Sequence, residues 1–169
     1  LMSRTGILPE ADFYCPIPYE PLSVLTESVL EAEIAKGSDG LLDRIFALMV
    51  KELELADPAW CEKISLRMQT ADSLREAWFE DRKQHGPFTW AEENLNEVER
   101  NKRDRRTVAW RYTVLRLHEV VQEMVPHLTE EDAERFKNGL ARVFIDNYAA
   151  IPPQSIRRLL ALREAGIIS

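Results

Sequence analysis

Eight side chains on two apolar stretches in the second half of the chain are the candidates for chemistry. They comprise charged groups, an amide and two phenols: Arg111, Tyr112, Arg116, His118, Arg142, Asp146, Asn147 and Tyr148. An unpaired charge on a mostly apolar helix is very costly, so each charged side chain must be paired or must face a cleft. Helical spacing would pair Arg116 with Glu119. It would likewise pair Arg142 with Asp146. The alternative is a surface that faces a small-molecule substrate or a partner.

A locally basic run, Arg100 to Arg106, precedes these stretches in an otherwise acidic chain. It holds three candidates for binding an anion such as a phosphate: Arg103, Arg105 and Arg106. The planar guanidinium fork matches phosphate and carboxylate geometry, which favours an anion site or a docking face for an acidic partner. The alternative is a solvated turn whose arginines pair with nearby aspartates and glutamates.

Motifs that hold phosphates, metals or activated serines are missing from this sequence. The six glycines form neither GxGxxG nor a P-loop, and there is no GxSxG. His118 and Glu119 begin like a zinc motif, but Gln122 occupies the position of the second histidine. Cys15 and Cys61 are far apart and form no CxxC, so both are expected to be reduced thiols. We therefore expect no metal and no cofactor held by this chain alone.

Two long helices should position the candidate side chains. Five apolar residues recur at helical spacing, namely Trp110, Val114, Leu117, Val121 and Met124. They predict a buried helix over 107–125, and a similar pattern predicts a second helix over 129–148. Each would be about 19 residues and roughly 28 Å long. The short connection at Pro126 predicts that they pack as an antiparallel hairpin.

Six further helices are expected around this hairpin. Start and stop signals place them at 26–36, 40–56, 57–68, 72–85, 89–101 and 152–165. The expected caps are Thr26, Ser38 or Asp39, Asp57, and a capping box from Thr89 to Glu92. The expected inward positions are Leu42, Ile45, Phe46, Met49 and Leu53, then Trp60, Ile64 and Met68 or their neighbours, then Leu74, Ala77 and Trp78. The fold class predicted is all-α, an orthogonal or antiparallel bundle of about six to eight helices around the central hairpin.

Composition and chain ends bound the domain organisation. The 169 residues suit one domain, and a net charge of −7 disfavours nucleic acid as a partner. No apolar run approaches the roughly 18 residues that span a bilayer, and we expect a cytoplasmic protein. Residues 1–25 are interpreted as a strand remnant and an extended proline-rich arm, and 26–169 as a single helical domain. Ile167 and Ile168 resemble the start of another strand, so the ends are either unstructured tails or the edges of a helical insert excised from a larger protein.

Several runs in the chain carry a resemblance to a known family. They are TVAWRY at 107–112, LRLHE at 115–119, VPHL at 125–128, VFIDNYA at 143–149 and IRRLLAL at 156–162. These runs resemble the central helical region of large bacterial FAD/NAD(P)-binding proteins, which are flavoprotein-like and distantly related to the N-hydroxylating monooxygenases. The opening SRTGILP at 3–9 also resembles the turn that follows a strand in that family's dinucleotide-binding fold.

The resemblance implies a helical insert or cap domain of an FAD/NAD(P)-dependent oxidoreductase. The domain would cover the cofactor cleft and help to form the substrate pocket, and its partner would be the parent dinucleotide-binding domain. FAD and NAD(P) would then belong to the parent protein, and this region would not catalyse a reaction by itself. The alternative is a non-catalytic helical interaction module that docks on a protein partner through the proline-rich arm or the basic run.

Overall fold

The computed structural model describes residues 21–148 and 151–168, with the backbone alone at Asp81 and Tyr148. Helices account for all the regular structure in these residues, which confirms the all-α class. In chain order they are α1 (Glu27–Ala35), α2 (Leu41–Ala56), α3 (Pro58–Lys63), η3 (Leu66–Met68), α4 (Leu74–Gln84), α5 (Pro87–Arg103), α6 (Ala109–Met124), η4 (Val125–His127), α7 (Glu130–Asn138), α8 (Leu140–Tyr148) and α9 (Pro153–Glu164). The predicted strand remnant and most of the proline-rich arm lie outside the described residues.

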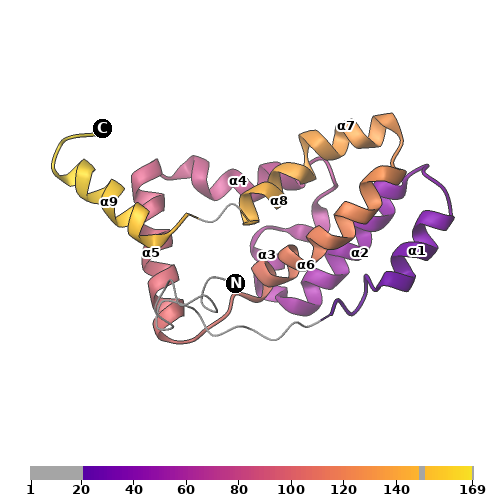
Figure 1. Cartoon of the computed structure of the whole chain (residues 1–169), viewed down its shortest axis with the longest axis horizontal. Coiled ribbons are helices and arrows are strands. Elements are labelled where there is room, and N and C mark those ends of the chain that lie inside the picture. Colours follow the sequence, from indigo (N-terminus) through magenta and orange to yellow (C-terminus); the bar gives the residue numbers. More distant parts are fainter. Residues whose placement is uncertain (1–20, 149–150, 169) are drawn as a thin grey trace, which may run out of the picture.

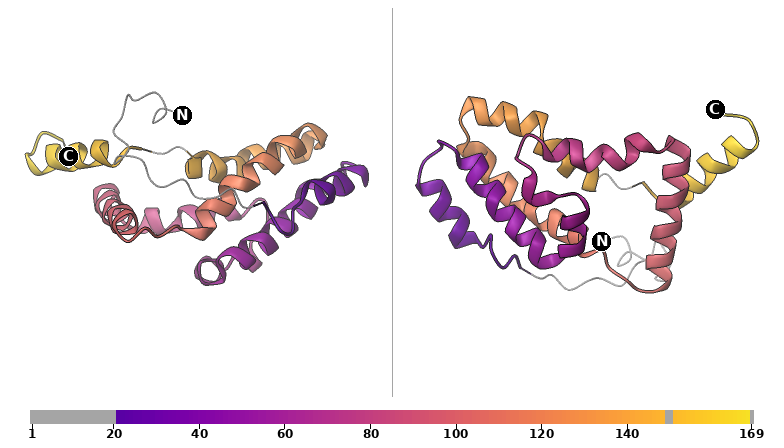
Figure 2. Two further views of the ribbon diagram at one scale, coloured as in Figure 1. Left: turned by 60° about the horizontal axis from the view of Figure 1, so that its bottom comes forward. Right: turned by 180° about the vertical axis from the view of Figure 1, so that it is seen from behind.

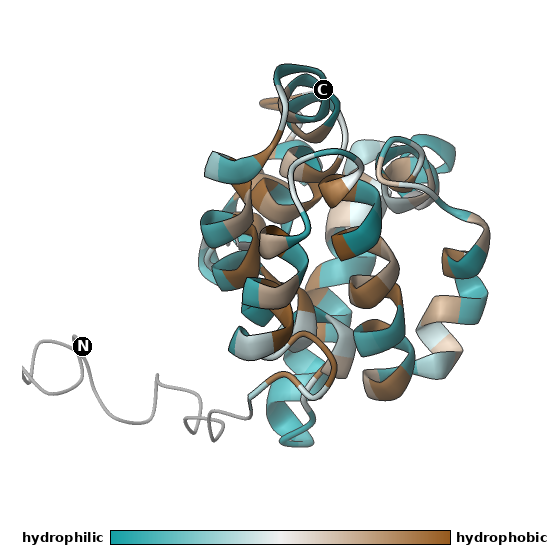
Figure 3. Cartoon of the chain, turned by 90° about the vertical axis from the view of Figure 1, so that its right-hand side faces the viewer, coloured by the Kyte–Doolittle hydropathy of each residue, from teal (hydrophilic) through white to brown (hydrophobic). Residues whose placement is uncertain are grey.

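The core lies between α2 and α6, with α1, α7 and α8 packed around them (Figure 1). The five predicted inward residues of α2 are all buried: Leu42, Ile45, Phe46, Met49 and Leu53. On α6, Val114, Leu117, Val121 and Met124 are buried as expected. Leu115 is 46% exposed, so the apolar stripe is narrower than its sequence suggests. Seen from the side, apolar residues gather between the helices (Figure 3).

The second helix of the predicted hairpin is broken at Gly139. The expected continuous helix over 129–148 is therefore wrong, although α8 still packs against α6. A Cβ atom at Gly139 would lie 2.6 Å from the carbonyl oxygen of Ala71 and 3.2 Å from that of Arg135. Only glycine allows the chain before α4 to approach so closely, and the helix axis changes direction there.

Helix starts follow the predicted caps in some places and depart from them in others. Thr26 and Asp57 accept hydrogen bonds from the third residue of each helix, as expected. The capping box at Thr89 is wrong, because α5 already begins at Pro87, whose fixed φ suits a first helical position. Neither Ser38 nor Asp39 caps α2, which begins after a left-handed residue, Gly40.

The predicted helix over 57–68 ends early. Ser65 adopts φ 51°, which ends α3 and turns the chain into the short η3 helix. Met68 is consequently 82% exposed rather than buried, while Cys61 and Leu66 enter the core. Of the expected inward residues or their neighbours, Leu66 and not Met68 takes the buried position. Cys61 is a free thiol.

Two helices extend away from the main block. α5 runs across the end of α4, and α9 packs on α5 (Figures 1 and 2). No residue of α9 is fully buried. Gly166 ends α9 in a left-handed conformation, and Ile167 donates its backbone N–H to Leu162. The described part of the chain contains no strand, so Ile167 and Ile168 do not form one here. No helix in this part has the length and apolar character needed to cross a bilayer.

Buried and half-buried charges join segments that are far apart in sequence. Glu52 on α2 is buried, and its carboxylate accepts backbone N–H groups from Ser23, Val24 and Leu25 at 2.6–3.0 Å. Arg135 on α7 binds three aspartates from different elements: Asp43, Asp72 and Asp132, at 2.7–3.1 Å. These contacts hold the N-terminal segment and the α4 start against the bundle.

Candidate ligand pocket

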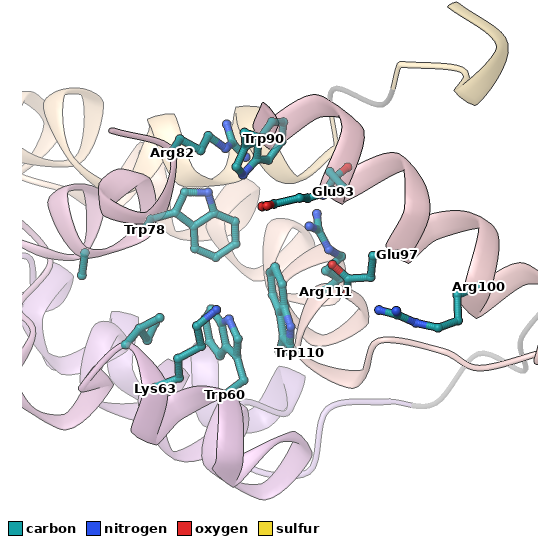
Figure 4. A pocket seen from close by; sticks show the side chains of 13 residues that line it. Trp60, Lys63, Trp78, Arg82, Trp90, Glu93, Glu97, Arg100, Trp110 and Arg111 are labelled. Atoms are coloured by element: carbon teal, nitrogen blue, oxygen red, sulfur yellow. The ribbon is translucent and has the colours of Figure 1, made fainter. Parts of the chain in front are cut away.

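The four tryptophans of the chain converge on one cavity. Trp60, Trp78, Trp90 and Trp110 come from four successive helices, α3, α4, α5 and α6. They line a cavity of about 400 Å³ between the main block and α5 (Figure 4). Ligand cavities in proteins are usually of roughly this size or somewhat larger. Residues separated by up to 50 positions are thus gathered on one concave surface.

Three of the indoles form a rigid wall. The rings of Trp60 and Trp110 stack with their centroids 4.5 Å apart and their planes 8° from parallel. Trp78 meets both rings edge-on, at 5.8 Å from Trp60 and 5.2 Å from Trp110. Stacked and edge-to-face pairs each contribute about 0.5–1.5 kcal/mol beyond burial. The wall is therefore ordered before any ligand arrives.

Local sequence explains why these rings lie at the edge of the core. The Trp60 backbone N–H donates to the capping carboxylate of Asp57 at 3.0 Å, which fixes the first turn of α3. Trp110 lies one turn before buried Val114, and Trp78 lies one turn after buried Leu74. Each ring thus continues a buried stripe to the point where the helices separate, and all four indoles are half-buried.

Arg82 is held across the top of the cavity by Asp146. Its guanidinium donates to both carboxylate oxygens, at 2.5 and 2.6 Å, and Trp78 Nε1 donates to Oδ2 at 2.8 Å. The guanidinium carbon also lies 4.4 Å from the centroid of the Trp90 ring. Burial raises the pKa of Asp146, but the hydrogen bonds from Arg82 and Trp78 outweigh it and leave the pKa below its usual range. Asp146 is thus a charged anchor and not a proton carrier near neutral pH.

Arg111 faces the cavity without a bound carboxylate. Its guanidinium carbon lies 4.5 Å from the centroid of the Trp110 ring. Within the described residues it makes no ion pair and no side-chain hydrogen bond, although Glu97 and Asp146 act on it from farther away. Burial lowers the pKa of Arg111, which remains charged at neutral pH. A half-buried cation of this kind is suited to an anion supplied from outside the chain.

A second cavity of about 350 Å³ adjoins the first. Asn94, Glu97 and Arg111 line both, so the two cavities meet along α5. The other walls of the second cavity come from α5, from the basic run and from the start of α6: Val98, Asn101, Lys102, Arg106, Thr107, Val108 and Tyr112. Because they share Asn94, Glu97 and Arg111, the two cavities lie side by side, and we refer to them together as the hollow.

The structure brings together half of the predicted site residues. Arg111 and Tyr112 line the hollow, Asp146 anchors its roof, and Asn147 donates Nδ2–H to the backbone oxygen of Arg111 at 3.2 Å. The Oδ1 atom of Asn147 is buried and has no hydrogen-bond partner among the described residues. The side chain of Tyr148 lies outside the described part.

The other predicted residues lie elsewhere. Arg116 lines a separate cavity beside Glu52, and the His118 ring lies 6.2 Å from that of Phe144. Arg142 is exposed on α8. The predicted pairing of Arg142 with Asp146 is wrong, because Asp146 faces α4, where Arg82 offers a bidentate partner.

The basic run is divided between solvent and the hollow. Arg103 is exposed and lies 3.5 Å from Asp104, and Arg105 is exposed with φ 52°. Arg106 lines the second cavity. Of the three anion-binding candidates, Arg106 is therefore the one that the fold places at the hollow.

Sequence reasoning missed the tryptophan cluster. Helical periodicity predicts Trp60, Trp78 and Trp110 as core residues and predicts no role for Trp90. The remaining charged residues that line the tryptophan cavity, also missed, are Lys63, Arg82, Glu93, Glu97 and Arg100. The one available signal was that four large aromatic residues each lie within about two turns of a helix end. Among the described residues no three or more histidine, cysteine, aspartate or glutamate side chains gather as metal ligands.

Comparisons of the sequence with known proteins identify a family. The profile of a family described as "YdhS-like middle domain" matches residues 26–148. The chain is 68% identical over 168 residues to the "Uncharacterized protein YdhS" of Escherichia coli (strain K12). That alignment covers 99% of this chain and 32% of the relative, so the chain spans about a third of the relative's length. No solved structure matches this chain.

Proposed function

The chain belongs to the YdhS-like middle-domain family, and from that premise we propose that it is the substrate-binding helical cap of a larger redox protein. The relative is about three times as long as the matched region, which leaves room for a separate catalytic domain. The resemblance of the hairpin runs to bacterial FAD/NAD(P)-binding proteins supports a parent that uses FAD and NAD(P). The reaction would take place outside this domain.

The observation that carries the proposal is the tryptophan-lined hollow with Arg111 at its centre. Four indoles and an arginine without a bound carboxylate line one cavity of about 400 Å³. Three of the indoles pack on one another, yet together with Trp90 and Arg111 they leave a cavity between the main block and α5. Arg111 makes no ion pair with the described residues, and its side chain lies beside Trp110, Glu93 and Glu97 (Figure 4). Such a surface binds and orients a small molecule.

The domain's contribution to the reaction would be binding, orientation and exclusion of water. FAD and NAD(P) bound by the parent protein would supply the hydride chemistry. The indole wall would fix the plane of the substrate, and Arg111 would fix its charged end. Covering the cofactor cleft would also keep water from the reacting atoms. No residue of this chain needs to act as a nucleophile or base in this scheme.

The partner of this domain would be the parent dinucleotide-binding domain, and the α5–α9 pair is the surface suited to it. Leu159 and Leu162 on α9 are 40% and 41% exposed, and Ile167 is 67% exposed. Val98 on α5 is 41% exposed. Apolar side chains on an outlying helix favour contact with another domain. The same surface would serve a non-catalytic interaction module, which is the alternative function.

The test uses the longer protein that contains this domain. We expect the purified protein to carry flavin, seen by its visible absorbance, and to oxidise NAD(P)H. Trp60→Ala and Arg111→Gln should lower kcat/KM for the substrate at least tenfold without removing the flavin. Arg142→Gln, an exposed residue on α8, is the matched control and should leave turnover unchanged.

Two outcomes would contradict separate parts of the proposal. A longer protein that binds neither flavin nor NAD(P) would exclude the redox role and favour the interaction module. A flavin-loaded protein whose turnover is unaffected by Trp60→Ala and Arg111→Gln would exclude the hollow as the substrate site.

A further inference from the structure

We propose that the tryptophan-lined hollow selects a planar aromatic carboxylate, with the ring against the indoles and the carboxylate on Arg111. The inference rests on the proposed function, because it names the ligand class of the same site. It follows from three properties of the hollow, namely the shape of its walls, the sign and spacing of its charges, and its size.

The walls combine the outer surfaces of the indoles with the charged and amide side chains that line the rest of the hollow. Trp60 and Trp110 are stacked on each other, and Trp78 stands at 78° and 86° to them. The indole N–H of Trp78 is already donated to Asp146, so this ring presents mainly its apolar surface. A flat aromatic ring needs surfaces of this kind and gains from offset or edge-to-face contacts.

The charges favour a single, localised negative charge. Lys63, Arg100 and Arg111 line the hollow without an ion-pair partner among the described residues, while Arg82 is neutralised by Asp146. Arg111 is the most enclosed of the three, because Lys63 and Arg100 are exposed. An anion at Arg111 would form a charge-assisted, bidentate contact.

Two glutamates limit how much negative charge the hollow can accept. Glu93 and Glu97 on α5 line the same cavity as Arg111 (Figure 4). A phosphate ester with nearly two negative charges would be repelled by both carboxylates at close range. A carboxylate carries one charge and matches the planar fork of a guanidinium. The same glutamates make an aromatic amine the strongest competing ligand class.

The size of the hollow sets the size of the ring system. The tryptophan cavity measures about 400 Å³ and the adjoining one about 350 Å³, with Arg111 lining both. One or two fused rings fit within the first cavity and leave room for substituents, and a carboxylate on Arg111 would lie where the two cavities adjoin. Substituents on the ligand would extend toward Lys102 and Arg106 in the second cavity.

The experiment titrates three matched probes into this chain and follows the indole N–H signals in ¹H–¹⁵N spectra. The probes are naphthalene-2-carboxylate, 2-naphthylmethylamine and cyclohexanecarboxylate, which separate charge from planarity. All four tryptophans line the cavity, so every indole signal reports on it. We expect naphthalene-2-carboxylate to shift these signals saturably, with a Kd at least tenfold lower than that of either other probe.

A variant connects this selectivity to Arg111. Arg111→Gln should raise the Kd for naphthalene-2-carboxylate at least tenfold, about 1.4 kcal/mol, and Arg111→Lys should restore part of the loss. Arg142→Gln should bind like the wild-type chain, because Arg142 lies on the exposed side of α8. An unchanged melting curve and unchanged core amide signals would show that each variant is folded.

Each remaining outcome overturns the inference in a distinct way. Tighter binding of the amine would show that the site prefers cations, with Glu93 and Glu97 as the binding groups. Equal binding of cyclohexanecarboxylate would remove the planar requirement, and absence of binding by all three probes would remove the ligand class. None of these results affects the flavin and turnover tests of the longer protein, so the two proposals fail separately.

Discussion

Asp146 and Arg111 are charged residues on neighbouring helices with opposite surroundings. Asp146 is held by a bidentate Arg82 and by the Trp78 indole. Among the described residues, the Arg111 guanidinium contacts the Trp110 ring, and Asn147 donates a hydrogen bond to the backbone oxygen of Arg111. A charge in partly apolar surroundings is costly without a partner. Asp146 has its partner within the chain, so we interpret it as structural. Arg111 has no ion pair among the described residues, so we interpret it as a ligand-binding residue.

Asp146→Asn should destabilise the chain by about 1–3 kcal/mol, because a half-buried Arg82 would lose its counter-ion. The amide oxygen can still accept from Trp78, which limits the loss. Urea unfolding followed by circular dichroism measures the change. Arg142→Gln, one turn away on the same helix, is the control and should stay within about 0.5 kcal/mol. Equal effects of the two substitutions would contradict Arg82 as the stabilising partner of Asp146.

The Cys61 thiol should be unreactive in the folded chain. Burial raises its pKa to about 11, and the nearby carboxylates of Glu54 and Asp57 act in the same direction. Little thiolate is present at pH 8, and thiolate is the reactive form. In a Cys15→Ser background, we expect a disulfide reagent to label Cys61 slowly at pH 8 and rapidly in urea. Fast labelling of the native protein would contradict the buried placement.

At the scale of elements, Gly139 decides the shape of the second half of the fold. Periodicity alone continues the helix through this position, but the backbone there has φ −105° and ψ −96°. α7 consequently packs against α2, and α8 packs against α4 and α6. This division brings Asp146 to Arg82 and so forms the roof of the hollow. One close backbone contact therefore positions a site about two turns away.

Gly139→Ala should destabilise the chain by more than about 2 kcal/mol, because its Cβ would lie 2.6 Å from the Ala71 carbonyl oxygen, which is backbone and cannot rotate away. Gly86→Ala is a matched control, since the nearest atom to its Cβ is 3.8 Å away and φ is −60°. We expect it to change stability by less than about 1 kcal/mol. Equal, small effects at both positions in thermal unfolding would contradict the close approach.

The α5–α9 pair should be the least protected part of the isolated chain. α9 has no fully buried residue and packs on α5, whereas α2 and α6 lie in the core. Backbone amides in regions with few buried apolar contacts exchange through local opening. We expect hydrogen exchange in 153–164 to be at least tenfold faster than in 109–124. In the longer protein the exchange of 153–164 should slow, and unchanged exchange there would argue against this surface as the domain contact.

At the scale of the whole molecule, Arg135 ties three elements together. It binds Asp43 on α2, Asp72 before α4 and Asp132 on α7. The hydrogen bond from Arg135 is the largest cause that lowers the pKa of Asp72, and burial opposes it. The hydrogen bonds that Arg135 donates to Asp72, Asp43 and Asp132 raise its pKa, so it remains charged. The half-exposed aspartates moderate the energy of these pairs.

Acid should weaken the fold, and Arg135→Gln should reduce that sensitivity. The pKa values of Asp72 and Asp146 are lower in the folded chain than when unfolded. Their stabilisation is complete above the unfolded pKa of about 3.9 and is lost as pH falls through the lower folded values. We expect the free energy of unfolding to fall between about pH 5 and pH 2, and to fall less in Arg135→Gln. Lys137→Gln, an exposed residue on the same helix, should keep the wild-type profile.

The sequence by itself determined the fold class, most helix bounds and the main core. The apolar stripes of α2 and α6 can be identified within each helix alone, because burial of one helix face requires apolar residues at fixed spacing along the chain. Thr26 and Asp57 are caps for a similarly local reason. Arg111 was also identified as a candidate, since a charge within an apolar stripe stands out without any knowledge of its neighbours.

Only the tertiary structure decided which side chains meet. Periodicity assigns Trp60, Trp78 and Trp110 to the core and gives Trp90 no role, because the convergence of the four rings depends on how four helices pack. Arg142 is wrong as the predicted partner of Asp146 for the same reason. Helical spacing describes contacts within one helix, and the observed partner, Arg82, belongs to another. Gly139 breaks its helix because a distant backbone segment approaches it. Contacts between elements depend on three-dimensional packing, which local periodicity does not encode.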